Sequence, residues 1–215
     1  MQAPPTLRLR LLCLHGNGTS GSILKRQLHP LAKACPELEL FFLDGAHETH
    51  AFNHMVAKVF GEAKHYRYME RRRRADSDGD EYGGIAEAVA HAEAAYKEHR
   101  CDGVLGFSQG ANLATMLCAH LETKPRLCVC FCGTLFGWEA QPECAGWFDS
   151  PLRVPSVHIV GRHDSIAATS VKLSTLFSEP RLLYHESDHR PFPPGPDEAT
   201  PLAEAVRSFM LSVAV

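Results

Sequence analysis

Short, continuous runs of apolar residues alternate along the chain with segments in which apolar residues recur every three or four positions. Continuous apolar runs indicate strands buried on both faces, whereas the longer spacing indicates amphipathic helices. The pattern predicts strands over residues 9–14, 38–43, 103–107, 127–132, 154–160 and 181–185. It predicts helices over residues 22–35, 84–100, 109–121 and 167–177, and a last helix that begins at Thr200-Pro201.

The regular alternation of strands and helices predicts an α/β fold. Crossover connections between consecutive parallel strands place helices on both faces of a mainly parallel sheet. Ligands of such sheets bind beyond the carboxyl ends of the strands. A functional site is therefore expected in the loops that follow the predicted strands. These loops begin at His15, Asp44, Ser108, Gly133, Gly161 and Glu186.

One connection is much longer than the others. About 40 residues, numbers 44–83, separate the second predicted strand from the next long helix, whereas most connections in compact domains have only a few. Within this insertion, residues 51–60 predict a short amphipathic helix whose apolar face includes Phe52, Val56 and Phe60. Because the insertion follows the carboxyl end of a strand, we expect it to form a lid or a wall of the substrate site. A decorated surface loop is the alternative.

Residues 106–110 read Gly-Phe-Ser-Gln-Gly, which follows the pattern G-x-S-x-G. The pattern alone is weak, but here a predicted strand leads into Ser108 and a predicted helix leaves it at once. This is the context of a nucleophile elbow, in which a sharp turn exposes the serine hydroxyl at the amino end of a helix. We therefore predict that Ser108 is a nucleophile. A serine that merely begins a helix is the alternative.

A serine hydroxyl needs a base to become nucleophilic, and the base needs an orienting acid. On this architecture the order along the chain is serine, acid, histidine. Asp164 follows the predicted strand 154–160, and His189 follows the predicted strand 181–185. Both residues, like Ser108, therefore lie just beyond the carboxyl end of a strand. We predict that they are the acid and the base.

Other residues compete for these two roles. His163 and His185 lie near the same loops, but His163 precedes the acid and His185 belongs to a predicted strand. Asp44, Glu139 and Asp149 also follow strand ends and remain alternative acids. The preferred pair satisfies both the chain order and the position at the edge of the sheet.

The negative charge that develops on a substrate oxygen during attack needs hydrogen-bond donors. The backbone N–H of Gln109, directly after the candidate nucleophile, is one expected donor. The backbone N–H of Asn17, in the glycine-rich loop after the first strand, is the other. Phe52, Tyr68 and Trp138 belong to loops on the same rim and are candidates for lining the substrate pocket.

Composition narrows the class of protein. The chain has 215 residues, 45% of them hydrophobic, and a formal net charge of −3, which predicts one globular domain over residues 1–215. The charge balance lacks the basic excess of nucleic-acid-binding proteins, and no apolar stretch approaches the roughly 18 residues of a membrane helix. Most of the eight cysteines lie in apolar runs and are expected as reduced core residues of a cytoplasmic protein.

No metal ion or organic cofactor is predicted. The histidines at positions 47, 50 and 54 lack the spacing of zinc motifs and are expected as solvated loop residues. Cys128, Cys130 and Cys132 alternate along one predicted strand. Because alternate residues of a strand share a face, all three are expected on one face, as core residues.

Four segments of the chain read LCLHGNGTSG, DGVLGFSQGANLA, VHIVGRHDSI and SDHRPFP. Together they resemble the fungal-type serine hydrolase (FSH) family of the α/β-hydrolase superfamily, which includes the ovarian-cancer-gene-2-like hydrolases. The resemblance spans nearly the whole chain. It implies an α/β-hydrolase fold, a triad of Ser108, Asp164 and His189, and action on carboxylic esters or thioesters. Asp188 departs from the family pattern, which usually has glycine before the histidine.

The sequence therefore predicts a serine esterase or thioesterase that acts on a small molecule through an acyl-enzyme intermediate. Two alternatives stay open. An acyl-protein-thioesterase or a dienelactone-hydrolase-like enzyme would share the catalytic residues and differ in the insertion. A non-catalytic acyl-binding protein could keep the fold without a reactive serine.

Overall fold

Six parallel strands form the central sheet of the protein, which a computed structural model describes over residues 9–61, 63–73 and 80–214. The order across the sheet is β10-β9-β8-β7-β1-β2. The strands are β1 (Arg10–Leu14), β2 (Glu39–Leu43), β7 (Gly103–Phe107), β8 (Cys128–Phe131), β9 (Ser156–Gly161) and β10 (Pro180–His185). Each predicted strand is present, and the α/β fold expected from the alternation of elements is confirmed.

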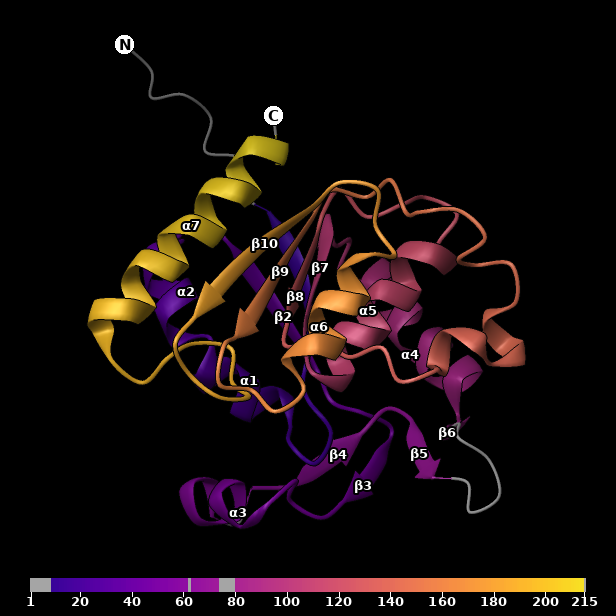
Figure 1. Ribbon diagram of the computed structural model, residues 1–215, viewed down its shortest axis with the longest axis horizontal. Coiled ribbons are helices and arrows are strands. Elements are labelled where there is room, and N and C mark those ends of the chain that lie inside the picture. The colour runs from indigo at the N-terminus through magenta and orange to yellow at the C-terminus, as the bar shows by residue number, and fades with distance from the viewer. Residues whose placement is uncertain (1–8, 62, 74–79, 215) are drawn as a thin grey trace.

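Helices cover both faces of the sheet (Figure 1). One face carries α1 (Gly21–Gln27), α2 (His29–Ala34) and α7 (Pro196–Ala214). The other carries α4 (Ile85–Glu98), α5 (Gln109–His120) and α6 (Ala167–Ser174). Each face has its own apolar core, and Leu12 and Cys13, neighbours in β1, belong to opposite cores because successive strand residues point to opposite sides. No helix in the described part of the chain has the length and apolar character needed to cross a bilayer.

Two helix boundaries differ from the sequence prediction. The helix expected over residues 22–35 is two helices, because Pro30 cannot continue the hydrogen-bond ladder of α1 and instead lies in the first turn of α2. The last helix begins at Pro196 rather than near Thr200. Asp197 and Glu198 then occupy its first turn, where negative charge is favoured, and Pro201 lies inside the helix.

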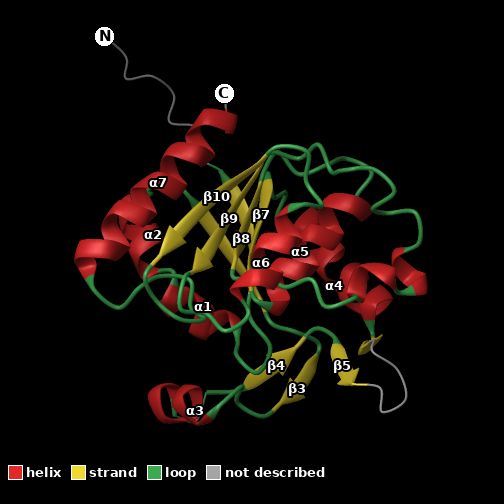
Figure 2. Ribbon diagram, in the orientation of Figure 1, coloured by secondary structure: helices red, strands yellow, loops and turns green. Residues whose placement is uncertain are grey.

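The long insertion forms two small antiparallel sheets and one short helix beyond the carboxyl ends of the central strands (Figures 1 and 2). β3 (His47–Thr49) pairs with β4 (His65–Arg67), and β5 (Glu70–Arg73) pairs with β6 (Asp80–Gly83). α3 (His54–Phe60) begins at Asn53, whose side chain accepts the Val56 N–H at 2.9 Å. Two 3₁₀ helices, η1 (Trp138–Ala140) and η2 (Pro142–Cys144), follow β8.

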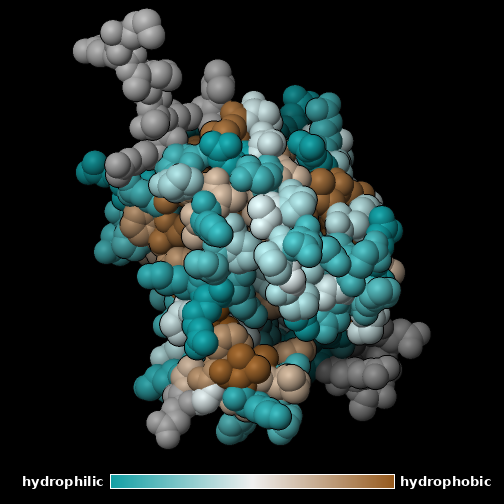
Figure 3. Space-filling model, turned by 90° about the vertical axis from the view of Figure 1, so that its left-hand side faces the viewer, coloured by the Kyte–Doolittle hydropathy of each residue, from teal (hydrophilic) through white to brown (hydrophobic). Residues whose placement is uncertain are grey.

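The predicted amphipathic helix of the insertion is shorter than expected and has no buried residue. Phe52, Met55 and Val59 are 54%, 60% and 57% exposed, and they form an apolar surface at the lower end of the molecule (Figure 3). α3 contacts the main body through Phe60, because the Arg26 guanidinium carbon lies 5.0 Å from the centroid of its ring, a cation–π contact. The insertion therefore extends the rim of the sheet without joining either core through α3.

Candidate active site

The turn between β7 and α5 consists of Ser108, whose φ of 53° lies in the left-handed region. Such a backbone costs about 1–3 kcal/mol and persists only where the surroundings hold it. The flanking glycines permit the turn. A Cβ atom at Gly106 would lie 2.2 Å from the Gly110 carbonyl oxygen, and one at Gly110 would lie 2.0 Å from the Leu14 carbonyl oxygen. The strained serine of a nucleophile elbow is therefore present at this position.

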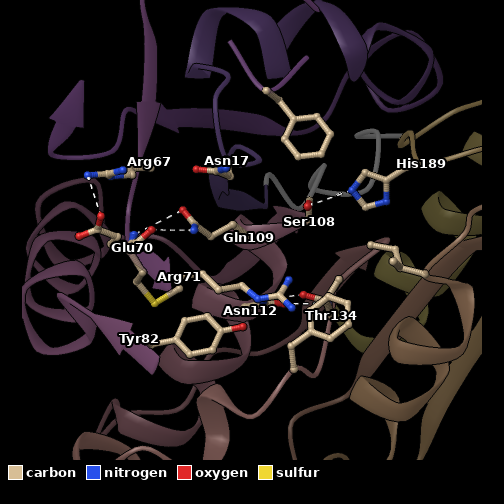
Figure 4. A pocket seen from close by; sticks show the side chains of 14 residues that line it. Asn17, Arg67, Glu70, Arg71, Tyr82, Ser108, Gln109, Asn112, Thr134 and His189 are labelled. Atoms are coloured by element: carbon tan, nitrogen blue, oxygen red, sulfur yellow. Dashed lines mark hydrogen bonds and ion pairs between the residues drawn. The ribbon is translucent and has the colours of Figure 1, made fainter. Parts of the chain in front are cut away.

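Ser108, His189 and Asp164 form a continuous chain of hydrogen bonds. Oγ of Ser108 lies 3.0 Å from Nε2 of His189 (Figure 4), and Nδ1 of His189 lies 2.7 Å from Oδ2 of Asp164. When Nδ1 donates its proton to the carboxylate, Nε2 is left free to accept the serine proton. The loops after β7, β9 and β10 supply the three side chains, so residues far apart in sequence meet at one edge of the sheet.

The Asp164 carboxylate is buried, with 1% of its side chain exposed. Its Oδ1 accepts the Ile166 N–H at 3.0 Å while Oδ2 faces His189. Burial acts to raise the pKa of Asp164, but the hydrogen bonds from His189 and from the Ile166 backbone outweigh burial, and the pKa is lowered. The carboxylate is therefore ionised at neutral pH and holds the imidazole ring in one orientation.

Three of the competing residues have other partners. His163 and His185 hydrogen-bond to backbone carbonyls at 3.2 and 3.1 Å, and Asp44 accepts the Gly21 N–H at 2.7 Å. The carboxylate of Asp188, which stands where the resembling family has glycine, binds the Arg190 guanidinium. The extra side chain at this position is thus neutralised within its own loop.

Asn17 lies in the loop after β1 and lines both cavities that contain Ser108. The next residue, Gly18, fastens this loop to the insertion. Its N–H donates to the Tyr66 carbonyl at 3.0 Å, and its carbonyl accepts the Phe52 N–H at 2.9 Å. Gly18 has a φ of 64°, and a Cβ atom there would lie 2.5 Å from the Phe52 nitrogen, so glycine is required for the close approach.

The side chain of Gln109 makes a second tie to the insertion. Its Oε1 accepts the Tyr68 N–H at 2.9 Å, and its Nε2 donates to the Met69 carbonyl at 2.9 Å (Figure 4). The amide thus satisfies two main-chain groups in the way that a neighbouring strand would. The residue directly after the candidate nucleophile therefore holds the segment between β4 and β5 against the elbow.

His15 is a buried histidine at the start of the same loop. Its Nδ1 lies 2.7 Å from the Gly16 carbonyl, and its Nε2 accepts the Gly45 N–H at 3.0 Å. Burial, which disfavours the charged ring, lowers the pKa of His15 from 6.5 to about 4. The ring is therefore a neutral connector between the β1 loop and the start of the insertion.

This buried histidine predicts a specific loss of stability in acid. The unfolded chain protonates His15 below its ordinary pKa of 6.5, whereas the folded protein protonates it only near 4, so folding free energy is lost as the pH falls between these values. Between pH 7 and pH 5 the loss is about 2 kcal/mol. Urea unfolding at both pH values should show this extra loss in the wild type relative to His15→Gln. Equal losses in both proteins would contradict the assignment.

Two cavities meet at Ser108 and His189. The larger, which we call the polar cavity, has a volume of about 340 Å³ and is walled mostly by the insertion and the β8 loop. The smaller, the α3 cavity, measures about 240 Å³ and lies between the β1 loop, α3 and the His189 loop. Besides Ser108, His189 and Asn17, the polar cavity is lined by Phe52, Arg67, Met69, Glu70, Arg71, Tyr82, Gln109, Asn112, Thr134, Phe136 and Ile166.

Of the three aromatic residues expected to line the pocket, one does so and two do not. Phe52 lines both cavities, with its ring centroid 6.4 Å from that of His189. Tyr68 and Trp138 line neither, so their assignment to the pocket is wrong. Tyr68 is buried and donates its hydroxyl to the Leu43 carbonyl at 2.6 Å, and Trp138 is buried and donates to the Thr134 carbonyl at 2.6 Å. Each aromatic side chain is buried in the core, where its polar group donates a hydrogen bond to a backbone carbonyl.

Sequence reasoning missed most of the polar cavity. Asn112, on α5 one turn after the elbow, is 3% exposed and exchanges two hydrogen bonds with Thr134, at 2.8 and 3.0 Å. A buried asparagine in an otherwise apolar helix face was an available signal for this pair. Arg67 and Tyr82 lie in the insertion, where no periodic pattern indicated the direction of a side chain.

The alternation of Cys128, Cys130 and Cys132 predicted that all three lie on one face of the strand, but the structure places Cys132 on the other face. It follows the end of β8, and its φ of 46° turns the thiol to the other side of the sheet, where Sγ lies 3.4 Å from the Arg190 carbonyl.

Among the described residues, Cys132 forms the sole cluster of potential metal ligands, together with Asp164 and His189. Burial raises the pKa of Cys132 to about 12, and a protonated thiol is a poor metal ligand. These residues therefore fit the hydrogen-bonded relay better than a metal site.

Comparisons with known proteins identify relatives of the chain. The family model described as serine hydrolase (FSH1) matches residues 6–194. The esterase OVCA2 of Danio rerio is 27% identical over 202 residues, which cover 84% of this chain and 89% of that protein. The hydrolase phiM of a fungal species is 29% identical over 199 residues, with 84% and 86% covered.

A solved structure shows the same fold. The carboxylesterase from Mesorhizobium loti superimposes with a TM-score of 0.64 at 22% identity, covering 95% of this chain and 88% of that one. The parallel sheet and the helices on both faces agree with this likeness. The chain belongs to the FSH1 serine hydrolase family, and its fold is the α/β-hydrolase fold.

Proposed function

We propose that the protein is a serine esterase that cleaves carboxylic esters and thioesters through an acyl-enzyme on Ser108. The observation that carries the proposal is the relay from Asp164 through His189 to Ser108, with distances of 2.7 and 3.0 Å. These are the distances of proton transfer between positioned groups. The relatives named as esterases support the same reaction class.

In the first half-reaction, Nε2 of His189 takes the proton of the Ser108 hydroxyl as Oγ attacks the carbonyl carbon. The backbone N–H groups of Asn17 and Gln109 then hold the oxyanion, and each such donor contributes about 2.7–4 kcal/mol to lowering the barrier. His189 returns the proton to the leaving oxygen or sulfur. Asp164 stabilises the imidazolium and keeps its Nδ1 protonated.

In the second half-reaction, His189 takes a proton from the water that attacks the acyl-enzyme, and it returns this proton to Oγ of Ser108 as the acid is released. The insertion acts as a wall of the substrate site, because its residues line the polar cavity on the side away from the sheet. An acyl-protein thioesterase or a dienelactone hydrolase would use the same steps, and the difference between these enzymes would lie in that wall. A non-catalytic acyl-binding protein would have no need of the hydrogen-bonded relay.

The proposal is tested by labelling with a fluorophosphonate, which reacts only with an activated serine. We expect one adduct, located on Ser108 by peptide mass spectrometry, and no adduct when His189 is replaced by alanine. The labelled protein should lose all hydrolysis of a panel of matched oxygen and sulfur esters. An unreactive Ser108 together with tight binding of the same esters would support the acyl-binding alternative instead.

We also propose a cytoplasmic location. All eight cysteines are free and buried, as expected for a protein that folds in a reducing compartment. Growth of cells that express a fluorescent fusion, followed by imaging and fractionation, tests this assignment.

A further inference from the structure

Several residues with hydrogen-bond donors line the polar cavity. Nε of Arg67 is buried and has no hydrogen-bond partner among the described residues. The side-chain amide of Asn17 and the hydroxyl of Tyr82 also line this cavity. Figure 4 shows Arg67 and His189 at opposite ends of the cavity, with Asn17 and Ser108 between them. The Arg67 guanidinium and the neutral donors of this lining therefore favour a ligand that brings acceptor atoms.

Arginines outnumber carboxylates at the end of the polar cavity that lies away from His189. Arg71 is hydrogen-bonded to Asp80 at 2.8 Å. Glu70 accepts a hydrogen bond from Arg72 at 2.8 Å, whereas it lies 3.8 Å from the nearest guanidinium nitrogen of Arg67. Three guanidinium groups, those of Arg67, Arg71 and Arg72, therefore share two carboxylates, and the group as a whole carries one excess positive charge, which suits one carboxylate and not a doubly charged phosphate.

The α3 cavity has the opposite character. It is lined by Asp164 and Asp188 and by the apolar side chains of Phe52, Val56 and Phe107. Because Arg190 neutralises Asp188, the Asp164 carboxylate leaves one net negative charge on this side of Ser108, which disfavours an anionic group here relative to the polar cavity. The two cavities therefore distinguish the two arms of an ester, the anionic arm in the polar cavity and the neutral arm in the α3 cavity.

We propose that the preferred substrates are esters that carry a free carboxylate on one arm, and that Arg67 binds this carboxylate at the end of the polar cavity. The inference rests on the proposed esterase function and specifies its substrate class. Oγ of Ser108 displaces the alcohol from the carbonyl carbon, water then hydrolyses the acyl-enzyme, and the remote carboxylate passes through both steps unchanged. Arg67 is a specificity-determining residue with no part in the proton transfers.

The test compares matched pairs of esters. One pair carries the charge on the acyl arm, para-nitrophenyl hydrogen glutarate against para-nitrophenyl pentanoate. The other carries it on the alcohol arm, the butyrate of para-hydroxybenzoate against the butyrate of para-cresol. For each pair, the ratio of kcat/KM for the charged and neutral ester is compared between variants, so the intrinsic reactivities cancel.

We expect Arg67→Met to lower this ratio by about 10-fold or more for one of the two pairs. Lys64→Met is the matched control, because it removes a positive charge from the same insertion at a side chain that is 68% exposed and lines neither cavity. It should leave both ratios unchanged. Equal losses on charged and neutral esters in Arg67→Met, or an unchanged ratio in both pairs, would overturn the role of Arg67.

A binding measurement separates this inference from the proposed function. Calorimetric titration of the Ser108→Ala protein with the charged ester that turns over best, or with monomethyl glutarate when neither turns over, reports affinity without hydrolysis. Adding Arg67→Met should weaken binding by about 10-fold or more. Binding that depends on Arg67 without turnover would contradict only the esterase reaction. Turnover of neutral esters with affinity independent of Arg67 would contradict only the carboxylate site.

Discussion

Replacing Ser108 with alanine is expected to lower kcat for ester hydrolysis by about 10⁶-fold, the loss seen when a triad nucleophile is removed. The variant loses the atom that forms the acyl-enzyme, while the turn that holds it stays intact because alanine fits the same space. Steady-state hydrolysis of a para-nitrophenyl ester, with circular dichroism as a check of folding, measures the effect.

The matched control is Ser165→Ala, which removes a hydroxyl from the lining of the α3 cavity. This variant should keep kcat close to that of the wild type, because Ser165 is outside the hydrogen-bonded relay. Turnover by Ser108→Ala within a factor of ten of the wild type would show that Ser108 is not the nucleophile.

Replacing Asp164 with asparagine is expected to lower kcat by about 10⁴-fold. The amide keeps the shape of the side chain but offers an N–H or a neutral oxygen to Nδ1 of His189, at the 2.7 Å contact that the carboxylate now makes. The imidazole can then adopt the wrong tautomer, and its positive charge during catalysis is not balanced. Comparison of kcat at saturating ester concentration measures the loss.

Asp188→Asn provides the control for charge near His189. Asp188 is adjacent in sequence, but its carboxylate pairs with Arg190. Removing its charge should change kcat by no more than a few-fold. A larger loss from Asp188→Asn than from Asp164→Asn would reverse the assignment of the orienting acid.

The sheet and the candidate triad could be predicted from the sequence for a common reason. Strands covered on both faces must be apolar throughout, as in Gly103–Phe107, which leaves a clear signal, and the polar loops at their carboxyl ends stand out against it. Asp164 and His189 each follow such a run, so their position at one edge could be inferred without knowing a single contact.

The insertion could not be predicted in the same way. Its strands have three or four residues each, with sequences such as His47–Thr49 and Glu70–Arg73 that are polar and show no alternation. They are held by backbone contacts to the β1 loop and by the amide of Gln109, neither of which has a sequence signature. Most of the polar cavity therefore became visible only in three dimensions.

The errors at Tyr68 and Trp138 have one physical origin. An aromatic residue in a loop can either line a cavity or anchor the loop in the core, and its own sequence neighbourhood does not distinguish the two. The outcome depends on a buried carbonyl within reach of the side-chain donor, here those of Leu43 and Thr134. Cys132 illustrates the same limit, because one left-handed residue reverses the side to which its thiol points.

The side-chain amide of Gln109 forms hydrogen bonds with main-chain atoms at positions 68 and 69, one N–H and one carbonyl. Every amino acid except proline supplies both groups. These hydrogen bonds can therefore form whatever side chains the two positions carry, proline at position 68 excepted. Residues beyond position 69 can therefore change and alter the lining of the polar cavity, as at Glu70, Arg71 and Tyr82, while this contact to the reactive centre is kept. The ties at Gly18 and His15 likewise end on main-chain groups of the insertion, so the insertion is attached to the reactive centre largely without regard to its side chains.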